Sequence, residues 1–128
     1  MHSKLIERIH DLLDQRFDRF PIGKCHQASE ALRVFGGLET VSGVYVFPED
    51  PSRTTPHHWN KDPSTGLYVD ITQYQFQQEG RDIILKIITG MPRALPQLRA
   101  DKNADPPGAL PSHLRDYLET ELRVARLI

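Results

Sequence analysis

The chain has 128 residues, 38% of them hydrophobic and 26% charged, with a formal net charge of −1. This length predicts one domain with a core of its own, and the balanced charge predicts neither nucleic acid nor an anionic membrane as a partner. A single cysteine excludes an internal disulfide, and no apolar run has the length of a signal-peptide core or a bilayer span, so we expect a cytoplasmic protein.

Two amphipathic helices are predicted in the first third of the chain. The first spans residues 4–17, with Ser3 as its N-cap. Its apolar positions have helical spacing: Leu5, Ile9, Leu12, Leu13 and Phe17. The second runs from about Cys25 to Phe35 and should end at Gly36 and Gly37.

Strands are predicted in the middle of the chain. Residues 40–47 are rich in β-branched and aromatic side chains. Residues 57–60 and 67–72 flank a turn with Pro and Gly at 61–66, so we expect an antiparallel hairpin. The apolar run at 81–90 fits a buried strand or a helix by period, and its isoleucines favour a strand.

The C-terminal third is predicted to hold a proline-rich arm and a helix. Residues 91–111 contain five prolines and should be irregular, whereas a helix begins at about Ser112. One side of that helix is apolar and serves either core packing or a homodimer contact: Leu114, Tyr117, Leu118, Leu122 and Ala125. The chain thus divides into a core (1–90), the arm (91–111) and the last helix (112–128).

Cys25 begins the second predicted helix, in the stretch GKCHQASEALRVFGG. A cysteine is nucleophilic as the thiolate, and the free N–H groups at a helix N-terminus stabilise that anion. The same helix end offers the Cys25 backbone N–H to an oxyanion, and Gly23 allows a tight turn into the helix. The alternative is an unreactive structural cysteine, because free cysteines are commonly buried.

The predicted hairpin carries a base and an acid. Successive strand residues face opposite sides of a sheet, so His57 and Trp59 should share one side and His58 the other. The hairpin brings Asp70 opposite this region. An Asp that accepts a hydrogen bond from one imidazole nitrogen fixes the tautomer and leaves the other nitrogen to face a thiolate. We therefore predict a Cys25–His57–Asp70 triad; the alternative is two surface histidines and an ordinary strand-end Asp.

The stretches HHW and YVDIT resemble the H-x-W…D-x-T arrangement of the transglutaminase-like branch of the papain-like fold, in which the cysteine starts the preceding helix. A closer resemblance is to the small YunG-like family of bacterial proteins, with the pattern G-x-C…G…H-x-W-N…D-G…V-D-L-T…Q-F. The matching positions are Gly23, Cys25, Gly43, His57, Trp59, Asn60, Gly66, Val69, Asp70, Thr72, Gln75 and Phe76. The resemblance covers about residues 20–80 and implies that Cys25 is the nucleophile, His57 the catalytic histidine and Asp70 the orienting acid.

Five residues are candidates for supporting roles at this site. Gln27 and Gln73 are candidates for the side-chain oxyanion donor that a Gln or Asn supplies in papain-like enzymes. Trp59 should shield the Cys–His pair and wall a substrate groove, or else belong to the ordinary core. The Thr72 hydroxyl should support the turn at the predicted acid, and Asn60 belongs to the same motif.

A metal site is not predicted. Cys25, His26 and the His57–His58 pair are the candidate ligands, but neighbouring histidines on a strand face opposite sides. Neither a C-x-x-C nor an H-x-x-x-H pair is present. We therefore expect no metal ligands and no cofactor.

The sequence as a whole predicts an α+β, papain-like core that carries out cysteine-dependent acyl transfer on a peptide or protein amide. Peptidase, deamidase and transglutaminase-like reactions all use this triad and stay open. The alternative is a non-catalytic papain-like binding or regulatory module that acts through the proline-rich arm and the last helix. A half-open Cys25 beside His57 would favour the enzyme, and a sealed apolar site would favour the module.

Overall fold

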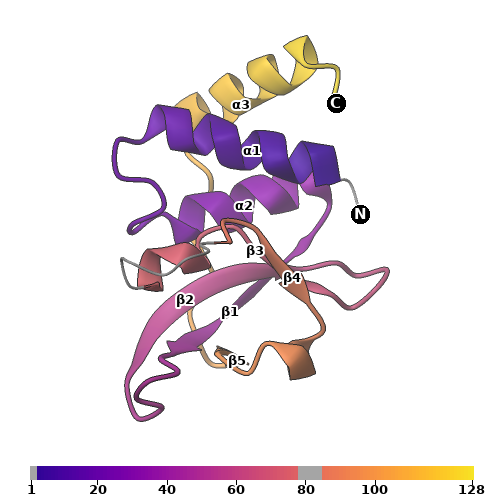
Figure 1. The fold of residues 1–128 in the computed structure, drawn as a ribbon. Coiled ribbons are helices and arrows are strands. Elements are labelled where there is room, and N and C mark those ends of the chain that lie inside the picture. The colour runs from indigo at the N-terminus through magenta and orange to yellow at the C-terminus, as the bar shows by residue number, and fades with distance from the viewer. Residues whose placement is uncertain (1–2, 78–84) are drawn as a thin grey trace.

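Three α-helices stack on one side of an antiparallel sheet in the computed structural model, which describes residues 3–77 and 85–128 (Figure 1). They are α1 (Ser3–Arg16), α2 (Cys25–Gly36) and α3 (Ser112–Val124). Helix α2 lies between α1 and the sheet, and α3 packs on α1 (Figure 1). The α+β class and all three predicted helices are confirmed.

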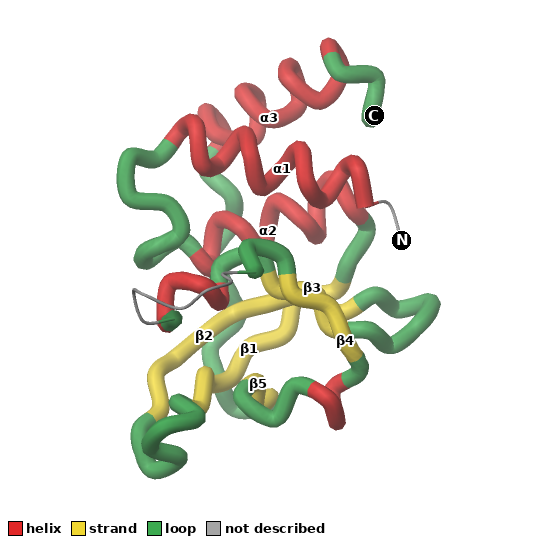
Figure 2. Tube along the Cα trace, in the orientation of Figure 1, coloured by secondary structure: helices red, strands yellow, loops and turns green. Residues whose placement is uncertain are grey.

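The five strands form one sheet in the order β4-β3-β2-β1-β5, with every neighbouring pair antiparallel (Figure 2). Their bounds are β1 Glu39–Val46, β2 Thr54–Lys61, β3 Tyr68–Asp70, β4 Ile88–Gly90 and β5 Leu98–Ala100. The predicted hairpin is the β2–β3 pair. Strand β2 begins three residues before the predicted strand, and β3 is only three residues long.

The last two strands depart from the sequence prediction. Residues 81–84 of the strand expected at 81–90 lie outside the described residues, and Ile88–Gly90 is the described portion that forms β4. Residues 91–111 are not irregular throughout, since they hold a short 3-10 helix, η2 (Pro92–Ala94), and the edge strand β5. A strand as short as β5 depends on its neighbour β1 for its hydrogen bonds and leaves little periodic pattern in the sequence.

Strand β5 approaches β1 closely at Gly43. Gly43 pairs with Ala100, and a Cβ built on Gly43 would lie 2.0 Å from the backbone oxygen of Arg99. A side chain at this position would push the two strands apart. This glycine therefore allows part of the predicted arm to complete the sheet.

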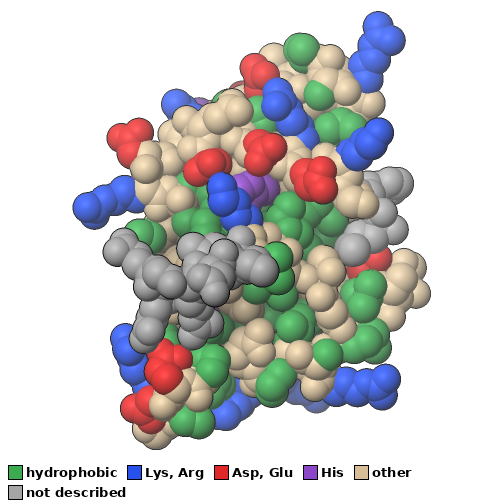
Figure 3. Space-filling model, in the orientation of Figure 1, with side chains coloured by type: hydrophobic (Ala, Val, Ile, Leu, Met, Phe, Trp, Pro, Cys, Tyr) green, Lys and Arg blue, Asp and Glu red, His purple; other side chains and the backbone are tan. Residues whose placement is uncertain are grey.

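Two apolar clusters lie on the two faces of the sheet. The first joins the three helices to the inner face of β3 and includes Leu114, Leu118 and Leu122 of α3, which are at most 1% exposed. These leucines pack in the core, whereas Ala125 from the predicted apolar face is exposed. The second cluster lies on the other face: Tyr45, Phe47, Trp59, Tyr68, Leu95 and Leu98. Charged side chains cover the outside of α1 and α3 (Figure 3).

The described helices are too short or too polar to cross a membrane.

Candidate cysteine–histidine site

The His57 ring and the Asp70 carboxylate form a buried pair. The ring donates a hydrogen bond from Nε2 to Asp70 Oδ2 over 2.7 Å, and the two side chains are 0% and 1% exposed. His57 lies on β2, and Asp70 ends β3, the next strand in the sheet. The predicted contact of these two residues across the hairpin is confirmed.

The other oxygen of the Asp70 carboxylate is held by the chain that follows it. Asp70 Oδ1 accepts the Thr72 backbone N–H at 3.0 Å and the Thr72 hydroxyl at 3.3 Å. Gln73 makes a long contact of 3.5 Å from Nε2 to Oδ2, and its Oε1 accepts a hydrogen bond from Gln97. The predicted supporting role of Thr72 is confirmed, and Gln73 contacts the acid.

The charge of the site depends on two opposed effects at His57. Burial disfavours the imidazolium, but the charge and hydrogen bond of Asp70 outweigh it, with a further contribution from Cys25, and raise the pKa of His57 to about 9. The ring is therefore protonated at neutral pH. An imidazolium in this position can give its proton to a leaving group.

Cys25 occupies the first position of α2. Gly23, two residues earlier, has a left-handed φ of +69° that turns the chain into the helix. Its N–H donates a hydrogen bond of 3.1 Å to Gln75 Oε1, which ties this loop to the segment after β3. The N-cap residue, Lys24, makes no side-chain capping bond, so its side chain accepts none of the first free N–H groups of α2.

The second nitrogen of His57 is the link to Cys25. Nδ1 is buried, and no side chain or backbone group of the described residues makes a well-aligned hydrogen bond to it. The Cys25 side chain is nevertheless close enough to raise the pKa of the ring through hydrogen bonding and charge. A loose contact between nucleophile and base is common when no substrate is bound. His57 thus contacts Asp70 directly and lies near Cys25, with no hydrogen bond formed between the ring and the thiol.

Aromatic rings fix the orientation of His57. Trp59 stacks on it with a centroid distance of 5.8 Å, and Phe76 meets it edge-on at 5.0 Å. Trp59 is 1% exposed, so it shields the ring as predicted but does not wall an open groove. Phe76 and Gln75 contribute to the site without having been singled out for a role, although the Q-F pair of the sequence pattern was the available signal.

The remaining predicted support residues lie apart from the reacting groups. Asn60 donates from Nδ2 to the backbone oxygens of Ser29 and Glu39, so it joins β2 to α2 and to the start of β1. Gln27 has a buried Oε1 that accepts no hydrogen bond from the described residues. The described contacts assign neither residue to an oxyanion.

His58 faces the opposite side of β2 from His57, as predicted. Its ring lies against His26 of α2 with a centroid distance of 4.1 Å, and its Nδ1 is 2.8 Å from the Ser42 hydroxyl. Burial and the charges of His26 and His57 lower the pKa of His58 to about 4. The ring is therefore neutral at physiological pH.

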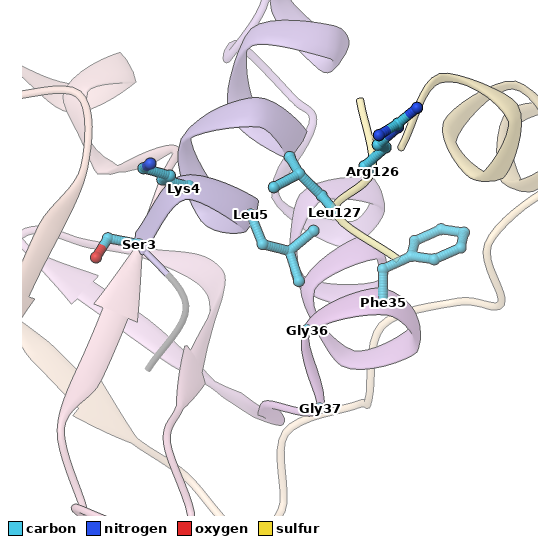
Figure 4. Close-up of a pocket in the computed structure, with 8 residues that line it drawn as sticks. All are labelled: Ser3, Lys4, Leu5, Phe35, Gly36, Gly37, Arg126 and Leu127. Carbon is cyan, nitrogen blue, oxygen red and sulfur yellow. The ribbon is translucent and has the colours of Figure 1, made fainter. Parts of the chain in front are cut away.

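A cavity of about 600 Å³ lies at the other end of α2, between its last residues, the start of α1 and the C-terminal segment (Figure 4). Its lining includes Phe35, Gly37 and Leu127. A helix of 12 residues is about 18 Å long. This cavity is therefore too distant to form part of the Cys25 site.

Comparison of the chain with protein-family models, curated proteins and solved structures gives no match.

Proposed function

We propose that the protein is a cysteine-dependent amide hydrolase or acyl transferase of papain-like, transglutaminase-like type. The observation that carries the proposal is the convergence of Cys25, at a helix start, with His57, whose far nitrogen is bonded to the buried Asp70. Cys25 as a residue is of intermediate exposure, which favours an enzyme over a sealed, unreactive cysteine. The packing of α2 on an antiparallel sheet agrees with the papain-like core that the sequence pattern implies.

In the proposed reaction, the Cys25 thiolate attacks the amide carbonyl carbon. The new C–S bond forms as the carbonyl oxygen becomes an oxyanion, which the free N–H groups at the start of α2 stabilise. The His57 imidazolium then gives its proton to the amine as the C–N bond breaks, leaving a thioester. Water then gives a proton to the now neutral His57 as its oxygen attacks the thioester carbonyl carbon, and the C–S bond breaks to release the carboxylic acid and restore the Cys25 thiolate and the His57 imidazolium.

The substrate class that best fits this site is a peptide or a protein side-chain amide. Of the three reacting groups only Cys25 is partly exposed, at a helix end, which suits a chain segment laid across the surface better than a small molecule enclosed in a deep pocket. Hydrolysis or deamidation is favoured over amine transfer because water requires no second binding site.

The decisive experiment measures the rate of iodoacetamide alkylation between pH 4 and pH 10, since Cys25 is the only thiol. A free cysteine with a pKa of about 8.5 is less than about 1% thiolate at pH 6. We expect the wild-type protein to react much faster at pH 6 than a free cysteine does, and the profile of His57→Gln to move to higher pH. His113→Ala, at an exposed position on α3, is the matched control and should leave the profile unchanged.

A slow profile that is identical in wild type and His57→Gln would refute an activated thiol. It would favour the non-catalytic module instead. A shifted profile justifies assays with peptide amides and with glutamine-containing peptides, in which ammonia release separates deamidation from peptide cleavage and Cys25→Ser must be inactive.

A further inference from the structure

A second cluster of reactive side chains shares the cysteine of the candidate site. Cys25 and His26 lie in the first turn of α2, and His58 lies on β2. One ligand atom from each of the three residues lies within 4.8 Å of the other two. This cluster excludes His57, which faces the opposite side of the strand.

We propose that Cys25, His26 and His58 form a binding site for a borderline divalent transition-metal ion such as Zn²⁺. Thiolate and imidazole are the ligands that Zn²⁺ prefers, and three protein ligands leave a fourth position open to water. Ligand atoms around a tetrahedral Zn²⁺ ion are about 3.5 Å apart. The observed separation therefore needs a closure of at most about 1.3 Å, to which the exposed His26 side chain can contribute by a change of rotamer.

The surroundings of His58 resemble those of a metal ligand. Its Nδ1 is paired with the Ser42 hydroxyl at 2.8 Å, which leaves Nε2 for the cluster. Metal-ligating histidines usually have the other ring nitrogen held by such a partner, which orients the ring. Ser42 itself is fixed in β1, directly opposite His58 in the β1–β2 register.

The cluster also opens onto an acidic cavity. His26 and His58 line a cavity of about 430 Å³ whose wall includes the carboxylate residues Asp101 and Asp105. Negative charge around a cleft raises the local concentration of cations. The cavity provides an entry path and a place for the water on the open coordination position.

Metal binding and nucleophilic attack would compete for the same sulfur. Zn²⁺ takes the Cys25 sulfur as the thiolate, any proton still on that sulfur passes to solvent, and no oxidation state changes. While the ion is bound, that sulfur is unavailable to an electrophile. The inference goes beyond the proposed function and concerns binding alone, so it can fail or succeed whether or not the protein hydrolyses amides.

The test uses the full chain, freed of metal and titrated with Zn²⁺ against a chromophoric chelator, and then with Co²⁺. We expect one ion per chain and a thiolate-to-cobalt charge-transfer band. His26→Ala should weaken Zn²⁺ binding by more than roughly tenfold, the lower limit seen when even an outer-shell partner is lost. His113→Ala should bind as the wild type does. Because His26 is exposed, its variant should keep the wild-type circular dichroism spectrum.

Three results would overturn the proposal: no binding by the wild type, equal binding by His26→Ala, or a cobalt complex without the thiolate band. Equal binding would indicate adventitious coordination by other histidines. A second readout is protection: Zn²⁺ should slow alkylation of Cys25 in the wild type and in His113→Ala, and should not do so in His26→Ala.

Discussion

Replacing Asp70 by Asn tests the electrostatics of the candidate site most directly. The substitution keeps the size of the side chain and removes the negative charge that, together with its hydrogen bond, opposes the effect of burial on the pKa of His57. A pKa raised from 6.5 to about 9 corresponds to a preference of the folded protein for the imidazolium of about 3 kcal/mol. With that charge removed, burial, the largest single effect at His57, is opposed mainly by the smaller effects of Cys25, so the pKa of His57 in Asp70→Asn should fall below 6.5.

The pKa is measured by NMR titration of the imidazole resonances, with His57 assigned from the spectrum of His57→Gln. The wild-type ring should titrate near pH 9, and the ring in Asp70→Asn should titrate below pH 6.5. A wild-type His57 that titrates at or below 6.5, or a pKa that the substitution leaves unchanged, would refute the account of the buried pair.

The same pair makes the stability depend on pH with a defined sign. Because the folded pKa of His57 exceeds its unfolded value, its contribution to the free energy of unfolding is complete below pH 6.5 and is lost as pH rises through about 9. The slope in that window is at most about 1.4 kcal/mol per pH unit. In Asp70→Asn we expect the pKa of His57 in the folded protein to lie below 6.5. The contribution of His57 to the free energy of unfolding should then increase as pH rises to about 6.5, which is the opposite of the wild-type trend. Urea unfolding at several pH values, with His57→Gln as the reference for other groups, measures both slopes.

Three further predictions concern the scaffold. Gly43→Ala should lower the free energy of unfolding by about 1–3 kcal/mol because its Cβ would strike β5; Gly108→Ala, with open space at its Cβ, should lose no stability in the same urea titration. Leu118→Ala should cost about 2–5 kcal/mol if α3 is part of the core, whereas Val124→Ala, at a position 76% exposed, should change stability by less than about 0.5 kcal/mol. Gln75→Ala should lower the melting temperature through loss of a hydrogen bond worth about 1 kcal/mol, and Gln75→Glu, which keeps the acceptor, should restore it.

The helices and the hairpin were predictable because their signals are local. Apolar spacing defines α1, α2 and α3, and the Pro/Gly turn with its alternating neighbours defines β2 and β3. Strand β5 was missed because three residues carry no useful period, and its place is decided by the close approach that Gly43 permits on a distant strand.

The site shows the same division between local and distant contacts. The alternation of strand residues was sufficient to place His57 and His58 on opposite faces, and the predicted hairpin brought Asp70 opposite this region. The hydrogen bond from Gly23 to Gln75 was not predictable, because it joins residues 52 positions apart through the packing of two loops. The expectation of no metal ligands weighed four side chains together, and the fold brings three of them, Cys25, His26 and His58, within 4.8 Å of one another.

The turn between β2 and β3 determines which of two adjacent histidines meets the acid. Asp62 closes this turn: its backbone N–H bonds to the Leu67 oxygen at 2.8 Å, and its Oδ1 accepts the Ser64 N–H and hydroxyl. In a strand, a slip of one residue exchanges the two faces. If inserting or deleting a single residue in this turn shifted the pairing of β2 and β3 by one residue, His58 rather than His57 would face the acid. The length of a turn that holds none of the three triad residues therefore sets which histidine contacts Asp70.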